Sequence, residues 1–542
     1  MSESFFGLNV AVRGLFTAQR SLDTVNHNLN NINTPGYSRQ QSVQVAARPM
    51  ALFDGTGMMG TGADVTGVKR VRDEYLDFKY WSENIALGEW KAKREVLSDI
   101  EVTFNEPSNS GFTTIMNDFF SSLQELGKDP SSSAVRALVK QRGVTMAKYF
   151  NSTATHFEDL QQDVNYRIQT KVEEVNSYAT QIQQLNRQIY ISELDGNTAN
   201  DLRDSRTLLV DKLSTIVNID ANEVVYGKLP DGRDDKHFVI NISGKALVDH
   251  YNISKLAIEQ RDALHKVNTE DIGNLYEVKW ADGNSLNIKG GELRGYLDVR
   301  DGNEGEIGPN LIASPNYKGI PYYQKKLNEF VRVFARSFNE GYIDTNGDGN
   351  YNAAEVNLTE GHAKGFGYNT ALAGSRFFTM KGIGGQPMIS TDFIADFTDP
   401  SVIYNSYNNV TAKNFTVSAD IIDDYNKIAA SSVQGEAGNI TVLNGLLGFR
   451  HNPDMFSEGA PEDYMKSLVA TLGIDSQQSK NYQANQQVIV TQITNRRLSD
   501  SGVSIDEEMT NLVKFQQAYN ASAKMIQTMG EIYDTLINRL FV

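Results

Sequence analysis

Apolar residues recur at heptad spacing at both ends of the chain. Near the N-terminus a leucine stands at every seventh position, namely Leu8, Leu15, Leu22 and Leu29. Near the C-terminus the same spacing connects Ile505, Leu512, Tyr519, Ile526, Tyr533 and Leu540. Such a narrow apolar stripe can be buried only against another helix. We therefore predict a terminal α-helical coiled-coil domain from residues 1–40 and 500–542. Its helices meet each other, or meet copies of the same chain, along this assembly seam.

Helical patterns also dominate the segments next to these ends. Pro35 and Gly36 stop the first helix, and an alternating, extended segment follows. The helical period returns at about Ser82, and a further helix opens near Ser132 with no clear break before Gly196. A helix of ~60 residues would be ~90 Å long, which is the length of a rod element. We predict a helical rod domain with an extended segment from residues 41–217, 309–345 and 460–499.

Between the rod segments the pattern changes to period two. Residues 237–242 and 246–248 alternate around a Ser243-Gly244 turn, which predicts a hairpin, and residues 276–280 predict another strand. We expect a β-rich insertion from residues 218–308. Residues 346–459 are rich in Gly, Asn, Asp and Thr, and we expect a second β-rich or irregular insertion there. The fold class is therefore multidomain α+β, with terminal coiled-coil helices, a long-helix rod domain and β-rich inserted domains.

Composition argues against several classes of protein. The chain has 51 basic and 67 acidic residues and a formal charge of -16, which disfavours nucleic acid and a polybasic membrane anchor as partners. No apolar run approaches the ~18 residues that a membrane span needs. The first twelve residues lack the pattern of a secretory signal peptide. Cysteine is absent, so disulfides, thiolate metal sites and cysteine nucleophiles are absent too.

The sequence shows no catalytic constellation. It has no Walker loop, no His-Glu-x-x-His and no Gly-x-Ser-x-Gly, and its seven histidines are scattered. Gly55, Gly57 and Gly60 match the dinucleotide fingerprint in spacing. However, glycine-interrupted, alternating residues follow where a phosphate-binding helix should begin. A flexible loop is the better interpretation. We expect a protein that is not an enzyme, with no catalytic residues and no required cofactor.

Residues 344–355 fill every fixed position of a twelve-residue calcium loop. The ligands would be side-chain oxygens of Asp344, Asn346, Asp348 and Glu355, the backbone carbonyl of Asn350, and Asn352 through a water molecule. The alternative is an ordinary polar turn, because clusters of Asp, Asn and Gly are common in loops. We predict a calcium ion here as a structural ligand rather than as a signal.

Several stretches of the chain resemble flagellar axial proteins. Residues 28–40 read Asn-Leu-Asn-Asn-Ile-Asn-Thr-Pro-Gly-Tyr-Ser-Arg-Gln, which looks like the N-terminal signature of rod, hook and hook-associated proteins. The ending Ser38-Arg39-Gln40 is most similar to the FlgK family of hook-associated proteins. Residues 60–76, 201–206, 290–300, 503–509 and 515–520 fit the same family. The resemblance covers roughly residues 1–345 and 460–542, and residues 356–455 match nothing in it.

The resemblance implies a structural component of the bacterial flagellum that links hook to filament and permits filament assembly. It implies export by the flagellar type III apparatus to the extracellular hook–filament junction. The implied partners are copies of the chain in an axial ring, the hook protein, a second junction protein and an export chaperone. Two alternatives remain: another axial subunit, from the hook or the distal rod, or a secreted calcium-dependent adhesin that uses residues 344–355.

Overall fold

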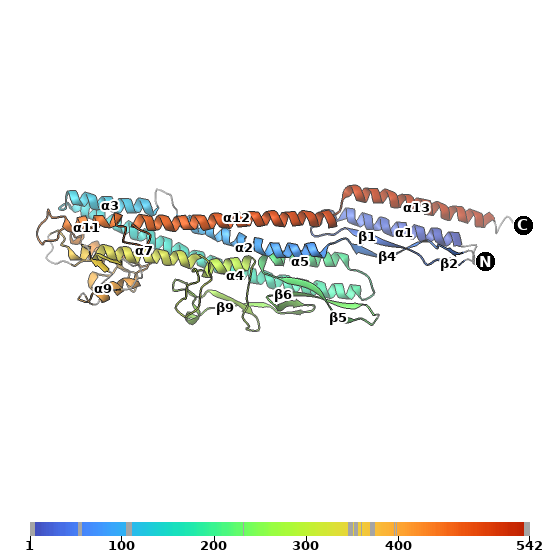
Figure 1. Ribbon diagram of the computed structural model, residues 1–542, viewed down its shortest axis with the longest axis horizontal. Helices are drawn as coiled ribbons and strands as arrows, with labels where there is room; N and C mark the ends of the chain where they lie inside the picture. The colour runs from blue at the N-terminus through green and yellow to red at the C-terminus, as the bar shows by residue number, and fades with distance from the viewer. Residues whose placement is uncertain are drawn as a thin grey trace.

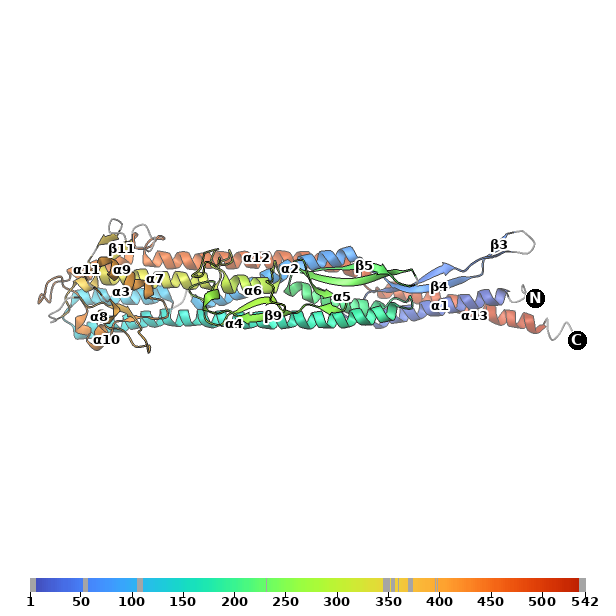
Figure 2. The ribbon, with the colours of Figure 1, turned by 90° about the horizontal axis from the view of Figure 1, so that it is seen from below.

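The protein is long and narrow, and both ends of the chain lie at the same end of the molecule (Figures 1 and 2). The computed structural model describes residues 6–51, 57–104, 111–230, 232–344, 351, 356–358, 360–368, 374–394, 396 and 398–535. Among these residues no helix is both long and apolar enough to cross a lipid bilayer.

The end that carries the termini is built from two helices and a ribbon. The helices are α1 (Phe6–Asn30) and α13 (Ile505–Asp534). In the ribbon, β1 (Gln40–Ala46) pairs with β4 (Ala63–Arg70), and β2 (Met50–Ala51) pairs with β3 (Met58–Met59). The Thr17 hydroxyl donates to the carbonyl of Ala63 over 2.8 Å, and the hydroxyls of Ser21 and Ser42 are 2.9 Å apart. The ribbon therefore packs on a polar side of α1, and the terminal helices meet each other within one chain.

Long helices form the rod next to this end. They are α2 (Glu74–Phe104), α3 (Phe112–Lys128), α4 (Ser133–Glu193), α5 (Asn200–Ile216), α7 (Ile320–Glu340) and α12 (Pro461–Ser501). The predicted long helix is confirmed, because α4 runs for 61 residues without a break. Its N-terminus begins where expected, since the Ser132 hydroxyl accepts a hydrogen bond from the backbone N–H of Val135.

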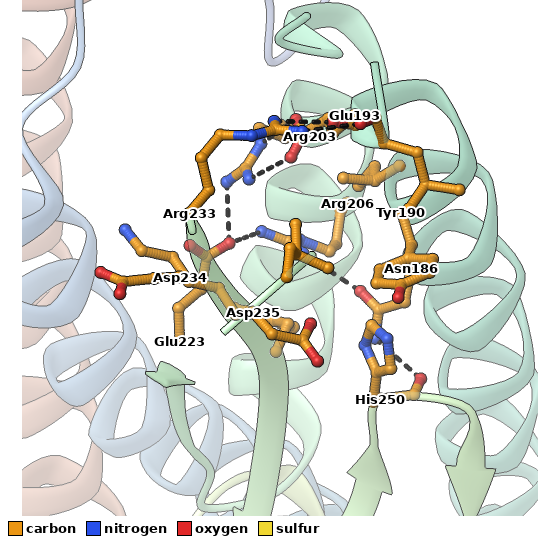
Figure 3. A pocket seen from close by; sticks show the side chains of 15 residues that line it. Asn186, Tyr190, Glu193, Arg203, Arg206, Glu223, Arg233, Asp234, Asp235 and His250 are labelled. Carbon is orange, nitrogen blue, oxygen red and sulfur yellow. Dashed lines mark hydrogen bonds and ion pairs between the residues drawn. The ribbon is translucent and has the colours of Figure 1, made fainter. Parts of the chain in front are cut away.

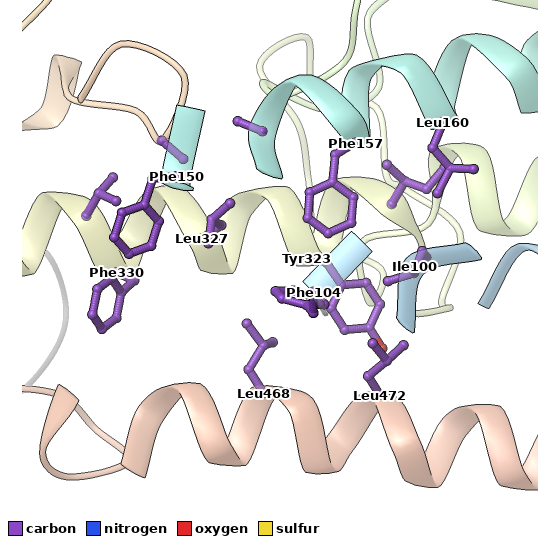
Figure 4. Close-up of a cluster of buried hydrophobic side chains, with 14 of the residues drawn as sticks. Ile100, Phe104, Phe150, Phe157, Leu160, Tyr323, Leu327, Phe330, Leu468 and Leu472 are labelled. Atoms are coloured by element: carbon purple, nitrogen blue, oxygen red, sulfur yellow. The ribbon is translucent and has the colours of Figure 1, made fainter. Parts of the chain in front are cut away.

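Aromatic and aliphatic side chains from α2, α4, α7 and α12 fill the core of the rod (Figure 4). Phe104 meets Phe157 edge-to-face at 5.4 Å, and Phe150 stacks on Phe330 at 5.3 Å. Leu468 and Leu472 close this cluster from α12. No side chain of α1 or of the described part of α13 belongs to this core. Something other than the main hydrophobic core must therefore hold the terminal helices.

The first insertion is a four-stranded antiparallel sheet with a smaller strand pair. The sheet has the order β5 (Asp220–Lys228), β6 (Asp234–Ile242), β7 (Lys245–Asp249) and β8 (Asn252–Ile253), and β9 (Leu256–Gln260) pairs with β10 (Tyr276–Trp280). A short helix, η1 (Ala263–His265), lies between the last two. The expected hairpin is present, with Ser243 at φ 48° and Gly244 at φ 91° in its turn. The segment also contains α6 (Glu292–Asp301), which the strand pattern did not predict.

The second insertion is irregular rather than β-rich in its described residues. Its strands are only three residues long, namely β11 (Tyr342–Asp344), β12 (Val356–Leu358), β13 (Phe378–Met380) and β14 (Phe415–Val417). Its helices are α8 (Ser390–Phe393), α9 (Pro400–Ser406), α10 (Ala419–Asp423), α11 (Thr441–Gly448), η2 (His362–Lys364), η3 (Tyr407–Asn409), η4 (Tyr425–Lys427) and η5 (Phe449–His451). Asp399, Ser418 and Asp424 accept hydrogen bonds from the backbone of the helices that follow them. Some of the polar residues in this segment are therefore helix caps.

Candidate functional site

Charged and polar side chains gather where the terminal helices meet the rod. Five parts of the chain converge there: the end of α1, the turn that leads from it into β1, the region from the end of β4 to the start of α2, helix α5, and the junction of α12 with α13 (Figure 1). The residues share one network of hydrogen bonds and ion pairs, and we call them the neck cluster. Its members are Asn28, Tyr37, Ser38, Arg39, Gln40, Arg70, Arg72, Asp77, Asp201, Asp204, Asp211, Arg497 and Glu508.

Asp204 of α5 is a central acceptor of this cluster. Its carboxylate accepts from the backbone N–H of Ser38 at 2.7 Å, from the Ser38 hydroxyl at 2.8 Å and from Arg70 at 3.1 Å. The Ser38 hydroxyl in turn accepts from Arg72 at 2.8 Å. Asp204 and Ser38 are both buried, so water does not compete for these bonds. The turn that follows α1 is therefore attached to the rod through one carboxylate.

A second group of charges connects α12 to α2 and α5. Asp77 accepts from Arg72 at 2.6 and 2.9 Å and lies 2.8 Å from Arg497. Arg497 also donates to Asp211 at 3.1 Å, and the indole N–H of Trp81 donates to the same carboxylate at 2.6 Å. Burial raises the pKa of the Asp211 carboxyl above its ordinary value, and the nearby charge of Arg497 opposes that shift. The last turns of α12 are thus held in place before α13 begins.

Glu508 is the one residue of α13 that is buried among its described positions, with 1% of its surface exposed. Its carboxylate accepts from Arg39 Nε at 2.8 Å and from Asn28 Nδ2 at 3.0 Å. Asn28 Oδ1 accepts from the Tyr37 hydroxyl at 2.8 Å and from the backbone N–H of Gln40 at 2.9 Å. This set of bonds joins α1, β1 and α13 at one point. Separating the partners of a buried charge pair costs free energy, so these bonds should hold the start of α13 firmly against α1 and β1.

Small residues set the spacing of the α1–α13 pair. A Cβ atom added to Gly7 would lie 2.6 Å from the Met529 side chain, and one added to Gly14 would lie 3.0 Å from Ser522 Oγ. Asn28 faces Glu508 through the hydrogen bond described above. As the position on α1 increases by seven, the position on α13 falls by seven, so the helices are antiparallel in constant register. Ala11, Ala18 and Val25 are buried between these positions on α1.

The predicted seam residues are only partly buried in the folded chain. Leu8, Leu15, Leu22 and Leu29 are each only half-buried, as are Leu512, Tyr519, Ile526 and Tyr533 on α13. Ile505 is 56% exposed, and Leu540 lies outside the described residues. The heptad pattern therefore identified the two helices, but the positions of α1 that are shown to lie against α13 include Gly7, Gly14 and Asn28. Glycine and asparagine add nothing to an apolar pattern, which is why these three positions did not stand out in the sequence.

The structure describes only part of the predicted calcium loop. Asp344 ends β11, is buried, and accepts a hydrogen bond from the Tyr404 hydroxyl at 2.8 Å. Asn346, Asp348, Asn350, Asn352 and Glu355 lie outside the described residues. Elsewhere in the described chain, no group of three or more His, Asp or Glu side chains is arranged to hold a metal ion.

Most of the stretches that supply the neck cluster could be recognised in the sequence, but their meeting in space could not be predicted. Ser38, Arg39 and Asp204 belong to stretches recognised by resemblance alone, and Arg497 falls within residues 460–499, for which the sequence predicted only a part of the rod domain. The sequence feature that could have pointed to the neck cluster is the position of these charged residues next to the boundaries of long helices. Ion pairs across 469 residues, such as Arg39 with Glu508, cannot be read from local spacing.

The two ends of the chain match families of flagellar axial proteins. Residues 8–37 match the family described as "Flagella basal body rod protein", and residues 494–540 match "Flagellar basal body rod FlgEFG protein C-terminal". These two matches cover most of α1, the end of α12 and all of α13, which supply Asn28, Arg497 and Glu508 of the neck cluster. The class of the protein is therefore that of the axial structural proteins of the flagellum.

The middle of the chain narrows the assignment. Residues 97–350 match "Flagellar hook-associated protein FlgK helical domain". The flagellar hook-associated protein 1 of Bacillus subtilis is 29% identical over 100% of this chain and 99% of that protein. That of Escherichia coli is 28% identical over 98% and 99%. The solved FlgK hook junction protein of Burkholderia pseudomallei has the same fold, with a TM-score of 0.52 and 14% identity over 80% of this chain and 100% of that one. Over its full length the chain is therefore similar to the flagellar hook-associated proteins of the FlgK family.

The register of the helix pair can be tested by a disulfide. The ideal Cβ at Gly14 lies 3.9 Å from Ser522 Cβ, and disulfides need about 3.5–4.5 Å between these atoms. Because the chain has no cysteine, a Gly14→Cys, Ser522→Cys variant carries a single pair of thiols. Mild oxidation should close an intramolecular bond, seen by mass and by gel mobility without reductant. A Gly14→Cys, Met525→Cys variant, with the second thiol off the register, should stay reduced. Equal closure in both variants would contradict the register.

Glu508 should hold α13 against the neck. In Glu508→Gln the bonds to Arg39 and Asn28 lose their charged acceptor, and such bonds contribute about 1.5–3 kcal/mol. Hydrogen exchange in the peptide 505–520 should therefore become at least about tenfold faster. Glu507→Gln is the matched control, because the side chain of Glu507 is 62% exposed although it also pairs with Arg39 at 2.9 Å. If the two variants exchange alike, the buried contact does not hold α13.

Proposed function

We propose that this chain is a non-enzymatic adaptor that joins the flagellar hook to the filament by assembling with copies of itself through its terminal helices. The observation that carries the proposal is the incomplete burial of these helices. The contact between α1 and α13 uses small residues, and it leaves the leucine row of α1 half-exposed. Phe16 on α1 and Met509, Val513, Met525 and Ile532 on α13 are largely exposed as well.

A second copy of the chain fits this surface. Apolar side chains at heptad spacing along two helices are typical of an interface with a further helix. The copy would offer the same spacing, and contact between unlike faces of successive copies repeats into a ring or a helical array. Net charge favours such a contact: α1 carries two arginines and one aspartate, whereas α13 carries five acidic residues and two lysines, so the two helices have opposite net charge.

We infer the remaining partners and the location from the similarity to this family. Relatives named flagellar hook-associated protein 1 align with at least 98% of this chain, so we infer the same place in the flagellum. In our proposal the chain is exported, and it contacts the hook protein on one side and a second junction protein on the other. An export chaperone would protect the terminal helices before assembly, because isolated helices are marginal in water. The neck cluster would then transmit load from the helix array to the rod.

The leucine row can be tested in a strain that lacks the gene. That strain should build hooks that carry no filament while filament subunits appear in the medium, and the unmodified gene should restore filaments. A Leu15→Asp, Leu22→Asp variant should be exported at normal levels and fail to restore motility, because it places two charges in the helix interface. Filaments should be absent in electron micrographs of these cells.

The control for this experiment is Gln19→Asp, Asn26→Asp, which adds the same charge to the same helix at exposed positions. It should restore filaments. Normal motility of the leucine variant would show that the row is not an interface between copies. A deletion strain without hooks would instead favour a hook or distal-rod subunit.

We also propose that residues 344–355 bind a structural calcium ion. The sequence supplies every ligand position, and the pairing of β11 with β12 supports closure of the loop. Asp344 pairs with Val356, so the first ligand lies opposite the residue that directly follows the twelfth position. A loop that surrounds an ion needs its two ends together in this way.

Calcium should raise the melting temperature of the protein. Extracellular calcium sites bind at about 0.1–1 mM, and a ligand at a hundred times its dissociation constant stabilises the folded state by about 2.7 kcal/mol. Glu355→Gln should abolish the rise and leave the calcium-free melt almost unchanged. Asp454→Asn, an exposed acidic position outside the loop, should keep the rise. If the melting temperature is the same with calcium and with a chelator, residues 344–355 form an ordinary polar turn and bind no calcium.

A further inference from the structure

A cavity of about 90 Å³ lies between the β5–β8 sheet and the end of the long rod helix (Figure 3). Side chains of α4, α5, β5 and β6 line it, and His250 closes one side. His250 occupies the turn between β7 and β8 and has a φ of 50°, which is unusual for a residue with a side chain. It is 6% exposed, and neither ring nitrogen has a hydrogen-bond partner in the described part of the chain.

Aromatic rings surround His250 on several sides. The imidazole of His237 on β6 stacks on it at 3.9 Å with 6° between the planes, and Tyr226 stacks on His237 at 4.9 Å. Tyr251 lies 3.8 Å away, and Tyr190 of α4 meets the ring edge-on at 5.4 Å. The imidazole ring of His250 is therefore enclosed by aromatic rings between the sheet and the rod.

The same turn carries hydrogen bonds that fasten the sheet to the rod. Asn186 Nδ2 of α4 donates to the backbone carbonyl of His250 at 3.1 Å, and Gln183 of α4 donates to the carbonyl of Tyr251. Asn186 Oδ1 accepts from Arg206 of α5 at 3.1 Å. Movement of His250 would therefore disturb the contact with α4 directly.

Positive charge already stands next to the ring. Arg206 is 5% exposed, pairs with Glu223 of β5 at 2.8 Å, and has an Nε with no partner among the described residues. Asp235 is 3.5 Å from His237 Nε2 and is the near carboxylate on β6, and Asp249 precedes His250 in the chain.

Two more charge groups complete the cavity wall. Arg203 of α5 pairs with Glu193 of α4 and with Glu223, each at 2.7 Å, so its charge is balanced. Asp234 and Lys236 of β6 lie at the rim. Burial, followed by the neighbouring His237, lowers the pKa of His250 to about 4, and Arg206 acts in the same direction while the two Asp residues oppose it.

We propose that the His250–His237 stack is an acid-sensitive latch, which fastens the β5–β8 sheet to α4 and α5 while His250 is neutral and releases it when His250 is protonated. Release exposes the ring to water, where its pKa returns to about 6.5. The released state then binds more protons than the fastened state between pH ~6.5 and ~4, so the fastened state loses stability as the pH falls through this window. Below it, further acidification adds nothing through this group.

Hydrogen exchange of the full-length protein at several pH values tests the latch. After correction for the intrinsic pH dependence of exchange, protection of the peptide 234–249 should fall about tenfold between pH 7 and pH 5. Protection of the core peptide 150–168 of α4 should not fall. His250→Asn removes the titrating group and keeps a residue that tolerates positive φ, so protection should become nearly independent of pH. His265→Asn, the same change at an exposed position on η1, should behave as the unmodified protein.

A second variant keeps the test decisive if His250→Asn weakens the sheet at every pH. His237→Gln removes the neighbouring imidazole that lowers the pKa of His250, so the loss of protection at pH 5 should become smaller than in the unmodified protein. The proposal is wrong if the unmodified protein keeps its protection at pH 5. It is equally wrong if His250→Asn and the unmodified protein lose protection to the same extent.

Discussion

The buried carboxylate of Asp204 is the contact on which the geometry of the molecule depends. It receives the backbone and the hydroxyl of Ser38 together with Arg70, and so it joins the turn after α1 to the rod. Glu508 has the corresponding role for α13, and Asp77 and Asp211 for the end of α12. The terminal helices contribute nothing to the main hydrophobic core in the described residues. Their position relative to the rod therefore rests on buried charge pairs.

Because buried charge pairs rather than the apolar core hold the terminal helices, two features of these helices can be understood together. The helices α1 and α13 lie close together because Gly7 and Gly14 have no side chains to keep the backbones apart. The same arrangement leaves the leucine row half-exposed, which would be a liability in a protein that worked alone. In the assembly that we propose, this row is the surface that binds the next copy of the chain. In this proposal the small residues of α1 pack against α13 within one chain, and the large apolar residues contact the next copy. Folding and assembly therefore use different side chains.

Much of the fold could be predicted because periodicity persists over long segments. α4 keeps one apolar stripe for 61 residues, and the β6–β7 hairpin shows alternation around a turn that tolerates positive φ. The secondary structure of the second insertion was harder to predict, because Asp and Ser occur both as caps of short helices and in turns between strands. The neck cluster could not be predicted from local pattern at all. Arg39 and Glu508 are neighbours only after the two ends of the chain have come together.

The central claim is that the neck cluster fixes the direction of the terminal helix pair relative to the rod. Spin labels on cysteines at Arg20 of α1 and Lys212 of α5, both exposed, measure this directly in a chain with no other thiol. The distance distribution should be narrow in the otherwise unmodified protein and clearly broader with Asp204→Asn, which removes the charge that Ser38 and Arg70 share. An equally narrow distribution in both proteins would contradict the account.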